Sequence, residues 1–558
     1  APFRAGPAAL RLRVLGPKGT WTLVSARGGT VSAKAGVIGR VRGRWRLVAR
    51  VAQPTAWGST ELRRRLVDQL EGVVDRRLAG RADELIGSAN RIECHTAPRP
   101  ARLAIAAVSR ELSGTAARRA AESAGWQVAE LVTLDDGRSL ADRLTGLQAA
   151  EVDAWLVAGG FDGRRSPRAL EAAALVAASR RPGTAPVIWA GDPDLVEAVA
   201  SLFEDDAVTA VPSPRPGAGR EEPAGLREHL GGVLRDALAR EDQAHLSPIS
   251  LPRAVGALAG LTGLRVLAVD VGARAAVRAL AEPDGSITSR VHGDGGLGGL
   301  ARVPGAAARV ARLAGDAGDE AAVADLLQTL RARPATLPET AAELAGTQAA
   351  ARVQLAALVE DEPIGPVDLV VGTGATIAFA PRPAQAARIL LDGIRPIGVT
   401  QLAIDASAAL GPLGSLPEDE VREGVALLGD DVLVPLGTSV VTRGGEPGRL
   451  AMRVTVRRPG WPDVGPISIR VGQLQVVPLP RGQAAELLIE PGDGVSLGAP
   501  RRSPRLHAEA TGGAVGLVLD ARGVPIGLPR RGDDRRAVIA GWREALEREA
   551  PPSVERIA

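Results

Sequence analysis

The stretch DLVVGTGATIAFAP, residues 368–381, decides the fold of this 558-residue chain. Apolar residues lead into Gly-Thr-Gly-Ala, and a second apolar run follows. The pattern predicts a buried strand that ends in a tight glycine turn, where backbone N–H groups can approach a phosphate or a nucleoside. Glycine also serves plain turn geometry, so this motif alone does not define a nucleotide site.

A second strand and turn lie upstream, in VLAVDVGARAAV, residues 266–277. Asp270 follows an apolar run, and at a strand end its carboxylate can hold a hydrated Mg²⁺ or orient a water. Gly272 would let backbone N–H groups approach a phosphate. An ordinary β-hairpin with an aspartate in its turn is the alternative, and the same choice is open for the glycine-rich segment 292–303, which suits either a site loop or a solvent loop.

Working outward, the periodicity of the apolar residues changes twice along the chain. Residues 101–212 alternate between near-continuous apolar strands and helices, which predicts a doubly wound parallel sheet of about five strands. Residues 263–287 predict two strands joined by a tight turn after Asp270, and residues 305–361 are helical in pattern. After residue 430 the pattern becomes all-β with frequent Gly and Pro, which predicts a separate sandwich or barrel over residues 430–530.

Composition narrows the functional classes. The isoelectric point is near 10.1, but the net charge is only +4 and acidic and basic residues are interspersed, so we expect no nucleic-acid partner. Cys94 is the single cysteine, which excludes an intrachain disulfide, and with His95 beside it on a strand it is poorly placed for a metal site. No apolar run approaches the ~20 residues that span a bilayer, so we expect a cytoplasmic protein with no membrane contact and no metal centre.

These motifs resemble those of the glutamate mutase L family, which is unrelated to the mismatch-repair protein of similar name. The resemblance rests on VLAVDVGARAAV, on VVGTGATIAFAPRPAQAARILLDGIRPIGVTQLAID, and on the upstream segments that begin IECHTAPRPARLAIAAVS and AWLVAGGFDG. It implies an α/β protein with a two-lobed actin/Hsp70/sugar-kinase-like core, a doubly wound parallel-sheet region and a C-terminal all-β domain. The expected divisions are a first lobe segment at 1–100, the doubly wound region at 101–225, a second lobe at 226–425, the β domain at 430–530, and a terminal helix and tail at 531–558.

The resemblance also implies a site for ATP or ADP with Mg²⁺. The first phosphate turn of the family matches RGGTVSAK, residues 27–34, where Arg27 replaces the expected aspartate. The threonines expected after Asp270 are replaced by Ala275 and Ala276. The implied catalytic residues are Asp270 and Asp405, and the implied cofactor-binding residues are Gly29, Lys34, Gly272, Gly372, Thr373, Gly374 and Ala375.

The loss of polar groups at both phosphate turns shapes the functional prediction. We expect an accessory, chaperone-like or scaffold protein with weak or no ATP hydrolysis, which binds a protein partner such as a cobalamin-dependent mutase. One alternative is an active ATPase that reactivates an adenosylcobalamin-dependent mutase, which the retained Asp270 favours. Another is a structural protein that self-assembles through its C-terminal β domain, so the oligomeric state stays open.

Overall fold

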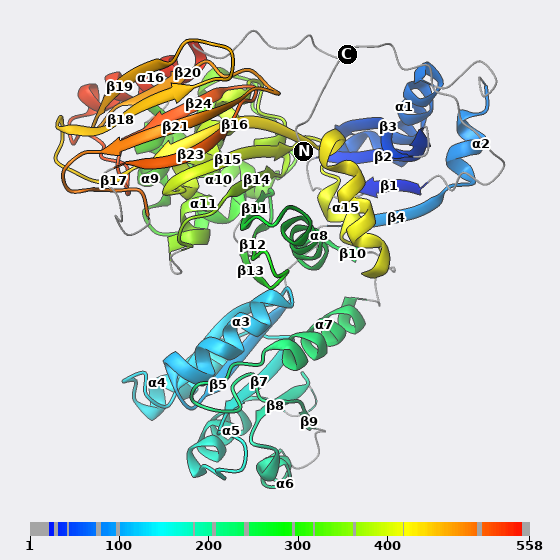
Figure 1. Cartoon of the computed structure of the whole chain (residues 1–558). Helices are drawn as coiled ribbons and strands as arrows, with labels where there is room; N and C mark the ends of the chain where they lie inside the picture. Colours follow the sequence, from blue (N-terminus) through cyan, green and yellow to red (C-terminus); the bar gives the residue numbers. More distant parts are fainter. Residues whose placement is uncertain are drawn as a thin grey trace. The chain divides into compact units, whose positions relative to one another are not determined.

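A computed structural model describes residues 22–26, 32–41, 44–73, 80–95, 101–181, 183, 185–203, 208–238, 245–292, 296–315, 319–360, 364–416, 418–498 and 505–548. The chain divides into two compact units. Unit 1 comprises Ala1–Thr96, Arg253–Ser286 and Asp294–Ala558, and unit 2 comprises Ala97–Pro252 and Ile287–Gly293. Figure 1 labels most of the helices and strands of both.

Unit 2 contains a five-stranded sheet in the order β6-β5-β7-β8-β9, and every strand pair is parallel. This confirms the doubly wound parallel sheet that the alternation of strands and helices predicted. The strands are β5 (Arg102–Ala107), β6 (Gln127–Thr133), β7 (Ala154–Gly159), β8 (Val187–Gly191) and β9 (Val208–Ala210). The helices are α3 (Thr115–Ser123), α4 (Leu140–Ala149), α5 (Pro167–Ser179), α6 (Val196–Ala200) and α7 (Ala224–Leu238), with short turns η2 (Arg110–Gly114) and η3 (Pro193–Leu195).

Each face of this sheet has its own apolar core, which explains why its central strands are apolar throughout. On one face α3 and α7 pack on the sheet, and the buried Trp126 donates its Nε1–H to the Leu230 carbonyl at 2.9 Å. On the other face α4, α5 and α6 cover the strands around Trp189 (Figure 1). Two further short strands fall in this unit, β10 (His245–Leu246) and β13 (Ile287–His292).

The main sheet of unit 1 runs in the order β12-β11-β14-β15-β16-β24-β20. Strands β11 and β14 are parallel, as are β14 and β15, whereas β12 pairs antiparallel with β11, and β16 with β15. The carboxyl ends of β11, β14 and β15 therefore meet at one edge, where ligands bind in open α/β sheets. The strands are β11 (Val266–Val271), β12 (Ala276–Ala281), β14 (Leu369–Thr373), β15 (Gly398–Asp405), β16 (Leu433–Val441), β20 (Leu474–Val477) and β24 (Gly516–Asp520).

Helices cover one face of the main sheet around a large apolar core. The segment PAQAARILLDGI forms α13 (Pro383–Ile394), which packs against α11 (Ala341–Glu360). The apolar residues of α13 and α11 supply much of this core. The remaining helices of unit 1 are α9 (Ala306–Ala314), α10 (Glu320–Ala332), α12 (Ala375–Ala378), α14 (Leu410–Leu413), α15 (Glu418–Val432) and α16 (Gly532–Arg548), with the short turn η5 (Leu297–Arg302). Helix α8 (Ser247–Thr262) is divided between the units, and its residues from Arg253 onward belong to unit 1.

The strand-rich region after residue 430 is present, but three of its strands extend the main sheet. Only β18 (Leu450–Arg457), β19 (Val464–Arg470), β21 (Ala484–Pro491) and β23 (Leu506–Thr511) form a second sheet among the described residues, beside the pair β17 (Arg443–Gly444) and β22 (Val495–Ser496). Strand β24 serves both layers, because Leu517 and Leu519 pack with the second sheet and Val518 faces the helical core. The boundary expected near residue 430 therefore falls within a continuous sheet.

A smaller sheet precedes these layers, with strands of unit 1 in the order β4-β1-β2-β3. These strands are β1 (Thr22–Ala26), β2 (Ser32–Val41), β3 (Arg44–Pro54) and β4 (Asn90–His95). Between β3 and β4 the chain forms the turn η1 (Thr55–Trp57) and the helices α1 (Gly58–Val73) and α2 (Ala82–Gly87). Leu62, Leu66 and Leu70 recur at helical spacing along α1, and all three are buried against β2 and β3, whereas Val73 at the end of the helix is exposed.

Candidate functional site

The turn between β11 and β12 has the geometry of a backbone anion cradle. Within it, the Gly272 N–H donates to the Ala275 carbonyl at 2.9 Å. The N–H groups of residues 296–298 donate to the carbonyls of residues 272–274, at 3.2–3.3 Å, and so draw those carbonyls to the back of the turn. In the described part of the chain, the N–H groups of residues 273–275 have no hydrogen-bond acceptor, which leaves consecutive donors free for an anion.

The Gly-Thr-Gly turn lies beside this cradle because β11 and β14 pair in register. Asp270 pairs with Thr373, and Val269 with Gly372. Gly374 has a φ of +88°, and a Cβ there would lie 2.6 Å from Asp270 Oδ1 and 2.5 Å from the Val271 carbonyl oxygen. Glycine at this position is therefore required both by the backbone conformation and by the close approach of the two turns.

Lys34 on β2 brings a cation to the same place. Its side chain is buried, and burial lowers the pKa of the ammonium, while the carboxylates of Asp270 and Asp405 act to raise it. Its Nζ also lies 4.8 Å from the centroid of the Phe379 ring, within cation–π range. Lys34 is thus held between the ends of β11 and β15 and the segment that follows the Gly-Thr-Gly turn.

Asp270 is partly exposed as a residue, whereas Asp405 is fully buried. Desolvation raises its pKa to about 6, with the nearby Lys34 opposing the shift and Asp405 adding to it. A carboxyl group with this pKa changes protonation state near neutral pH, and an acid with a perturbed pKa at the end of a parallel strand is typical of functional sites.

Asp405 ends β15 and is fully buried, but its oxygens already accept hydrogen bonds. Oδ1 accepts from the N–H groups of Ser407 and Ala409 at 3.2 and 3.1 Å, and Oδ2 accepts from that of Leu410 at 3.0 Å. Burial nevertheless raises the pKa of Asp405, against the effect of these donors and of Lys34. These hydrogen bonds fix the loop after β15 to Asp405. The catalytic role of Asp405 stays a prediction.

A small cavity of about 10 Å³ lies beside Lys34, between β2, β3 and the loop after Asp405. Arg50 crosses this space and donates to Ser407 Oγ at 2.9 Å. The volume corresponds to about one water molecule. The space beside Lys34 is therefore too small for a nucleotide.

The structure brings together most of the site residues predicted from the sequence. Gly272, Gly372, Thr373, Gly374 and Ala375 lie in or directly after the two turns, next to Lys34 and the two aspartates. Gly29 and Arg27 lie outside the described residues, so their predicted roles are not tested.

Sequence reasoning missed two contributors. One is Phe379, whose ring faces Lys34. The other is the backing of the cradle by residues 296–298, where a Cβ on Gly296 would meet the Ala273 carbonyl at 2.4 Å. The glycine-rich pattern of residues 292–303 was the available signal, and its residues 296–298 lie against the turn.

The residues present fit Mg²⁺ only as it is bound in nucleotide sites, where phosphate groups supply part of its ligands. Within the described ranges, His, Cys, Asp and Glu side chains nowhere gather in a group of three or more that could hold a metal. Mg²⁺ in nucleotide sites commonly takes one or two carboxylates, and phosphate oxygens and waters supply the other ligands. Asp270 meets that requirement, and Mg²⁺ bound there would neutralise phosphate charge.

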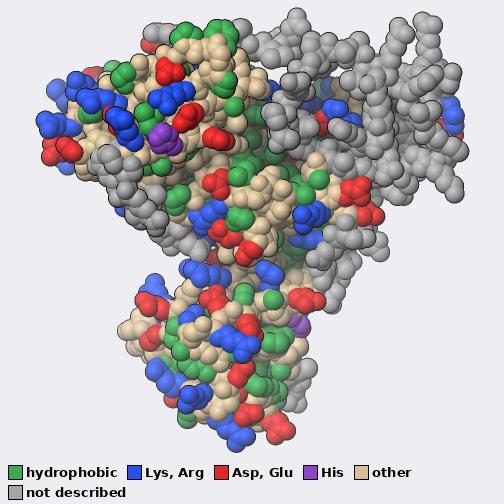
Figure 2. Space-filling view, viewed as in Figure 1, with side chains coloured by type: hydrophobic (Ala, Val, Ile, Leu, Met, Phe, Trp, Pro, Cys, Tyr) green, Lys and Arg blue, Asp and Glu red, His purple; other side chains and the backbone are tan. Residues whose placement is uncertain are grey.

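Two surface features bear on the partner class. Among the described residues no helix is both long enough and apolar enough to cross a bilayer. Figure 2 shows acidic and basic side chains interspersed over the visible described surface. On this face the described residues form no extended basic patch of the kind that nucleic-acid binding uses.

Fold and site together define an α/β protein with a candidate phosphate-binding turn, a glycine turn and a buried lysine at the ends of parallel strands. The chain belongs to the MutL protein family, whose model matches residues 23–432, and this is the glutamate mutase L family that the sequence motifs resemble. No curated protein matches the chain.

Solved structures align with the chain at low identity. Component A of (R)-2-hydroxyglutaryl-CoA dehydratase from Acidaminococcus fermentans is 9% identical, with 73% of this chain and 99% of that chain covered and a TM-score of 0.27. A nucleotide-free acetone carboxylase is 10% identical, with 81% of each chain covered and a TM-score of 0.28. The Ppx/GppA family member of Aquifex aeolicus is 9% identical, with 74% and 89% covered and a TM-score of 0.20.

Proposed function

We propose that this chain is a nucleotide-binding accessory protein that acts on a protein partner, a cobalamin-dependent mutase, and hydrolyses ATP slowly or not at all. The observation that carries the nucleotide part is the juxtaposition of Lys34, Asp270 and Gly374 with the free N–H groups of residues 273–275. Backbone donors and one lysine suffice to hold phosphate groups. Membership of the MutL family supports the choice of partner.

Slow hydrolysis follows from what the site lacks. Phosphoryl transfer needs in-line positioning, a metal and stabilisation of the developing charge. The cradle residues 273, 275 and 276 are alanines and bring no hydroxyl, and the oxygens of Asp405 are engaged by backbone N–H groups. Losing one charge-stabilising group commonly costs ~3 kcal/mol of transition-state stabilisation. Asp270 would therefore have to bind the metal ion and also orient the attacking water.

A second candidate function is an ATPase that reactivates the mutase, and the state of Asp270 is the observation that favours it. A carboxyl group with a pKa of about 6 can accept a proton from water near neutral pH. In this case the same residue would act as a general base, and phosphate release would depend on it.

Melting of the full chain with Mg-ATP, Mg-ADP or neither, together with phosphate release, separates these functions. We expect both nucleotides to raise the Tm and phosphate release to stay near background. Gly374→Val should abolish the Tm increase, because its Cβ would displace Asp270 and the Val271 carbonyl. Gly285→Ala is a matched control, a glycine with a φ of +84° and open space around it.

The possible outcomes decide between the two functions. A Tm that no nucleotide changes would refute nucleotide binding. Robust phosphate release that Asp270→Asn abolishes would establish the ATPase instead. Partner binding is tested separately, by sedimentation of the chain with a purified adenosylcobalamin-dependent mutase, with and without Mg-ATP. Sedimentation as separate species in every condition would remove the mutase from the proposal.

A further inference from the structure

Unit 1 contains a second cavity, and none of its lining residues belongs to the two turns. Arginine side chains surround this cavity. Its volume is about 420 Å³, within the range of small-molecule sites. The walls are the end of α9, the first half of α11, the first half of α13 and the outer part of α16. Five arginines and one glutamate supply the charged lining: Arg352, Arg382, Arg388, Arg536, Arg543 and Glu547.

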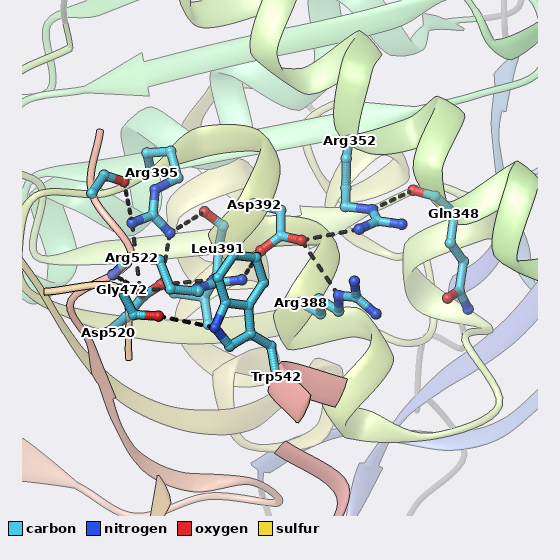
Figure 3. A network of polar contacts seen from close by, with 11 residues as sticks. Gln348, Arg352, Arg388, Leu391, Asp392, Arg395, Gly472, Asp520, Arg522 and Trp542 are labelled. Atoms are coloured by element: carbon cyan, nitrogen blue, oxygen red, sulfur yellow. Dashed lines mark hydrogen bonds and ion pairs between the residues drawn. The ribbon is translucent and has the colours of Figure 1, made fainter. Parts of the chain in front are cut away.

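The inner wall of this cavity belongs to a buried network with an excess of positive charge (Figure 3). Asp392 is paired with Arg352 at 3.0 Å, with Arg388 at 3.4 Å and with Arg522 at 2.7 Å. Asp520 is paired with Arg522 at 2.7 Å and with Arg395 at 2.6 Å.

The network therefore contains four guanidinium groups and two carboxylates. Five of these side chains are at most 7% exposed: Asp392, Asp520, Arg395, Arg352 and Arg522. A buried excess of cations is costly unless an anion compensates it.

Arg388 is the cation of this network with the weakest partner. Within the described residues its one polar contact is the 3.4 Å approach to Asp392, and its side chain is 14% exposed. Burial and the charges of Arg352 and Arg522 lower its pKa to about 9. Figure 3 shows Arg388 and Arg352 at the end of the network away from Asp520. An anion in the cavity would relieve this repulsion.

Two unused donors point to a ligand independently of the charge count. Gln348 lines the cavity, and its Nε2 is buried without a hydrogen-bond acceptor in the described residues. An orphaned buried amide is uncommon in a folded protein and calls for a partner. Arg543 on α16 also lines the cavity and makes no ion pair or hydrogen bond within the described residues, whereas Arg382 is paired with Glu547 at 2.7 Å and Arg536 with Asp533.

We propose that this cavity, which we call the arginine pocket, is a binding site for a small phosphorylated molecule, held by Arg352, Arg388 and Arg543 with Gln348 as a neutral donor. Guanidinium groups match phosphate oxygens with paired hydrogen bonds, and this favours phosphate over a single carboxylate. The ligand would join α16 to α11 and α13, and so fasten the C-terminal helix to the core of unit 1. The site is separate from the proposed nucleotide turns.

Calorimetry on the full chain with inorganic pyrophosphate as the probe, at fixed ionic strength, tests the arginine pocket. We expect saturable binding that weakens at least tenfold in Arg543→Ala, an exposed residue with no hydrogen bond or ion pair to the described part of the chain. Glu547→Gln removes the one carboxylate of the lining and should tighten binding severalfold. Arg331→Ala, an exposed arginine on α10 outside the pocket, is the control and should leave affinity unchanged.

Asp270→Asn and Gly374→Val distinguish this site from the nucleotide turns. If either of them removes pyrophosphate binding while Arg543→Ala does not, the probe binds at the turns and the arginine pocket is not the site. Absence of saturable binding, or unchanged affinity in both Arg543→Ala and Arg388→Gln, would also overturn the proposal. Citrate provides a carboxylate comparison, and tighter binding of citrate than of pyrophosphate would contradict the preference for phosphate.

Discussion

Asp270 and Asp392 are acids of the same unit whose surroundings shift their pKa values in opposite directions. Around Asp270 desolvation dominates, and one lysine compensates it in part. Around Asp392 desolvation also acts, but Arg522, Arg388 and Arg352 together outweigh it and lower the pKa to about 2. The number of cations close to each carboxyl group, rather than its depth, decides the sign.

The first prediction concerns Asp270. Its pKa is raised in the folded state, so the folded protein binds more protons than the unfolded chain between about pH 4 and 6. The free energy of unfolding should fall as pH rises through this window, and Asp270→Asn should remove that part of the fall. Urea unfolding at pH 4.5 and 7.5 measures it, with Asp325→Asn on α10 as control. A pH dependence that is identical in wild type and Asp270→Asn would contradict the assignment.

The second prediction concerns Asp392, whose pKa is lowered. Its stabilising contribution should be complete above about pH 4 and be lost as pH falls towards 2. At pH 7, Asp392→Asn should lower the free energy of unfolding by about 3–5 kcal/mol, because Arg352 and Arg388 lose their carboxylate and Arg522 keeps only that of Asp520. Urea titration of both proteins measures this. A loss below about 1 kcal/mol would mean that solvent or an anion compensates the arginines.

At the scale of elements, α16 packs on the core of unit 1 through Ile539, Trp542 and Leu546, and Trp542 is its aromatic anchor. The Trp542 Nε1–H donates to the Gly472 carbonyl at 3.1 Å, and its ring lies 5.0 Å from the guanidinium carbon of Arg522. The indole is 7% exposed. Arg395 reaches the same place from the end of α13, where it adopts a left-handed φ of +53° and donates to the Gly523 carbonyl at 2.6 Å.

The third prediction follows from this anchor. Trp542→Ala should cost about 3–5 kcal/mol of unfolding free energy through the loss of buried aromatic surface. Trp542→Phe keeps a ring over Arg522 and loses mainly the hydrogen bond to Gly472, so it should cost less, nearer ~1 kcal/mol plus the smaller ring. Chemical denaturation ranks the two variants. Equal losses would show that the hydrogen bond, and not the ring, holds α16.

The elements also show what a sequence can predict. Helix α13 and strands β11, β14 and β15 were predictable because apolar periodicity and glycine turns are local signals. The membership of β16, β20 and β24 in the main sheet was not, because edge pairing depends on partners far along the chain. In the site, the Gly374 turn was readable from its motif, whereas Phe379 and residues 296–298 act through contacts that no local pattern encodes.

At the scale of the whole molecule, unit 2 has a sheet and two cores that are complete within residues 101–234. The fourth prediction is that a fragment of residues 97–252 folds on its own, with a cooperative urea transition and α/β circular dichroism. It should be somewhat less stable than in the full chain, since it lacks the hydrogen bond from Ser289 to the Glu122 carbonyl at 3.0 Å. A fragment without a cooperative transition would contradict the prediction.

The division of the chain into units has a consequence for how the protein can be taken apart. The backbone passes between the units at four places, after residues 96, 252, 286 and 293. Cleaving any one of these peptide links leaves unit 2 joined covalently to residues of unit 1 on at least one fragment. A protease that nicks the chain once therefore cannot liberate either unit. The two fragments should copurify under native conditions and separate only in a denaturing detergent. The cleaved chain would then behave as two complementary fragments that stay bound to each other.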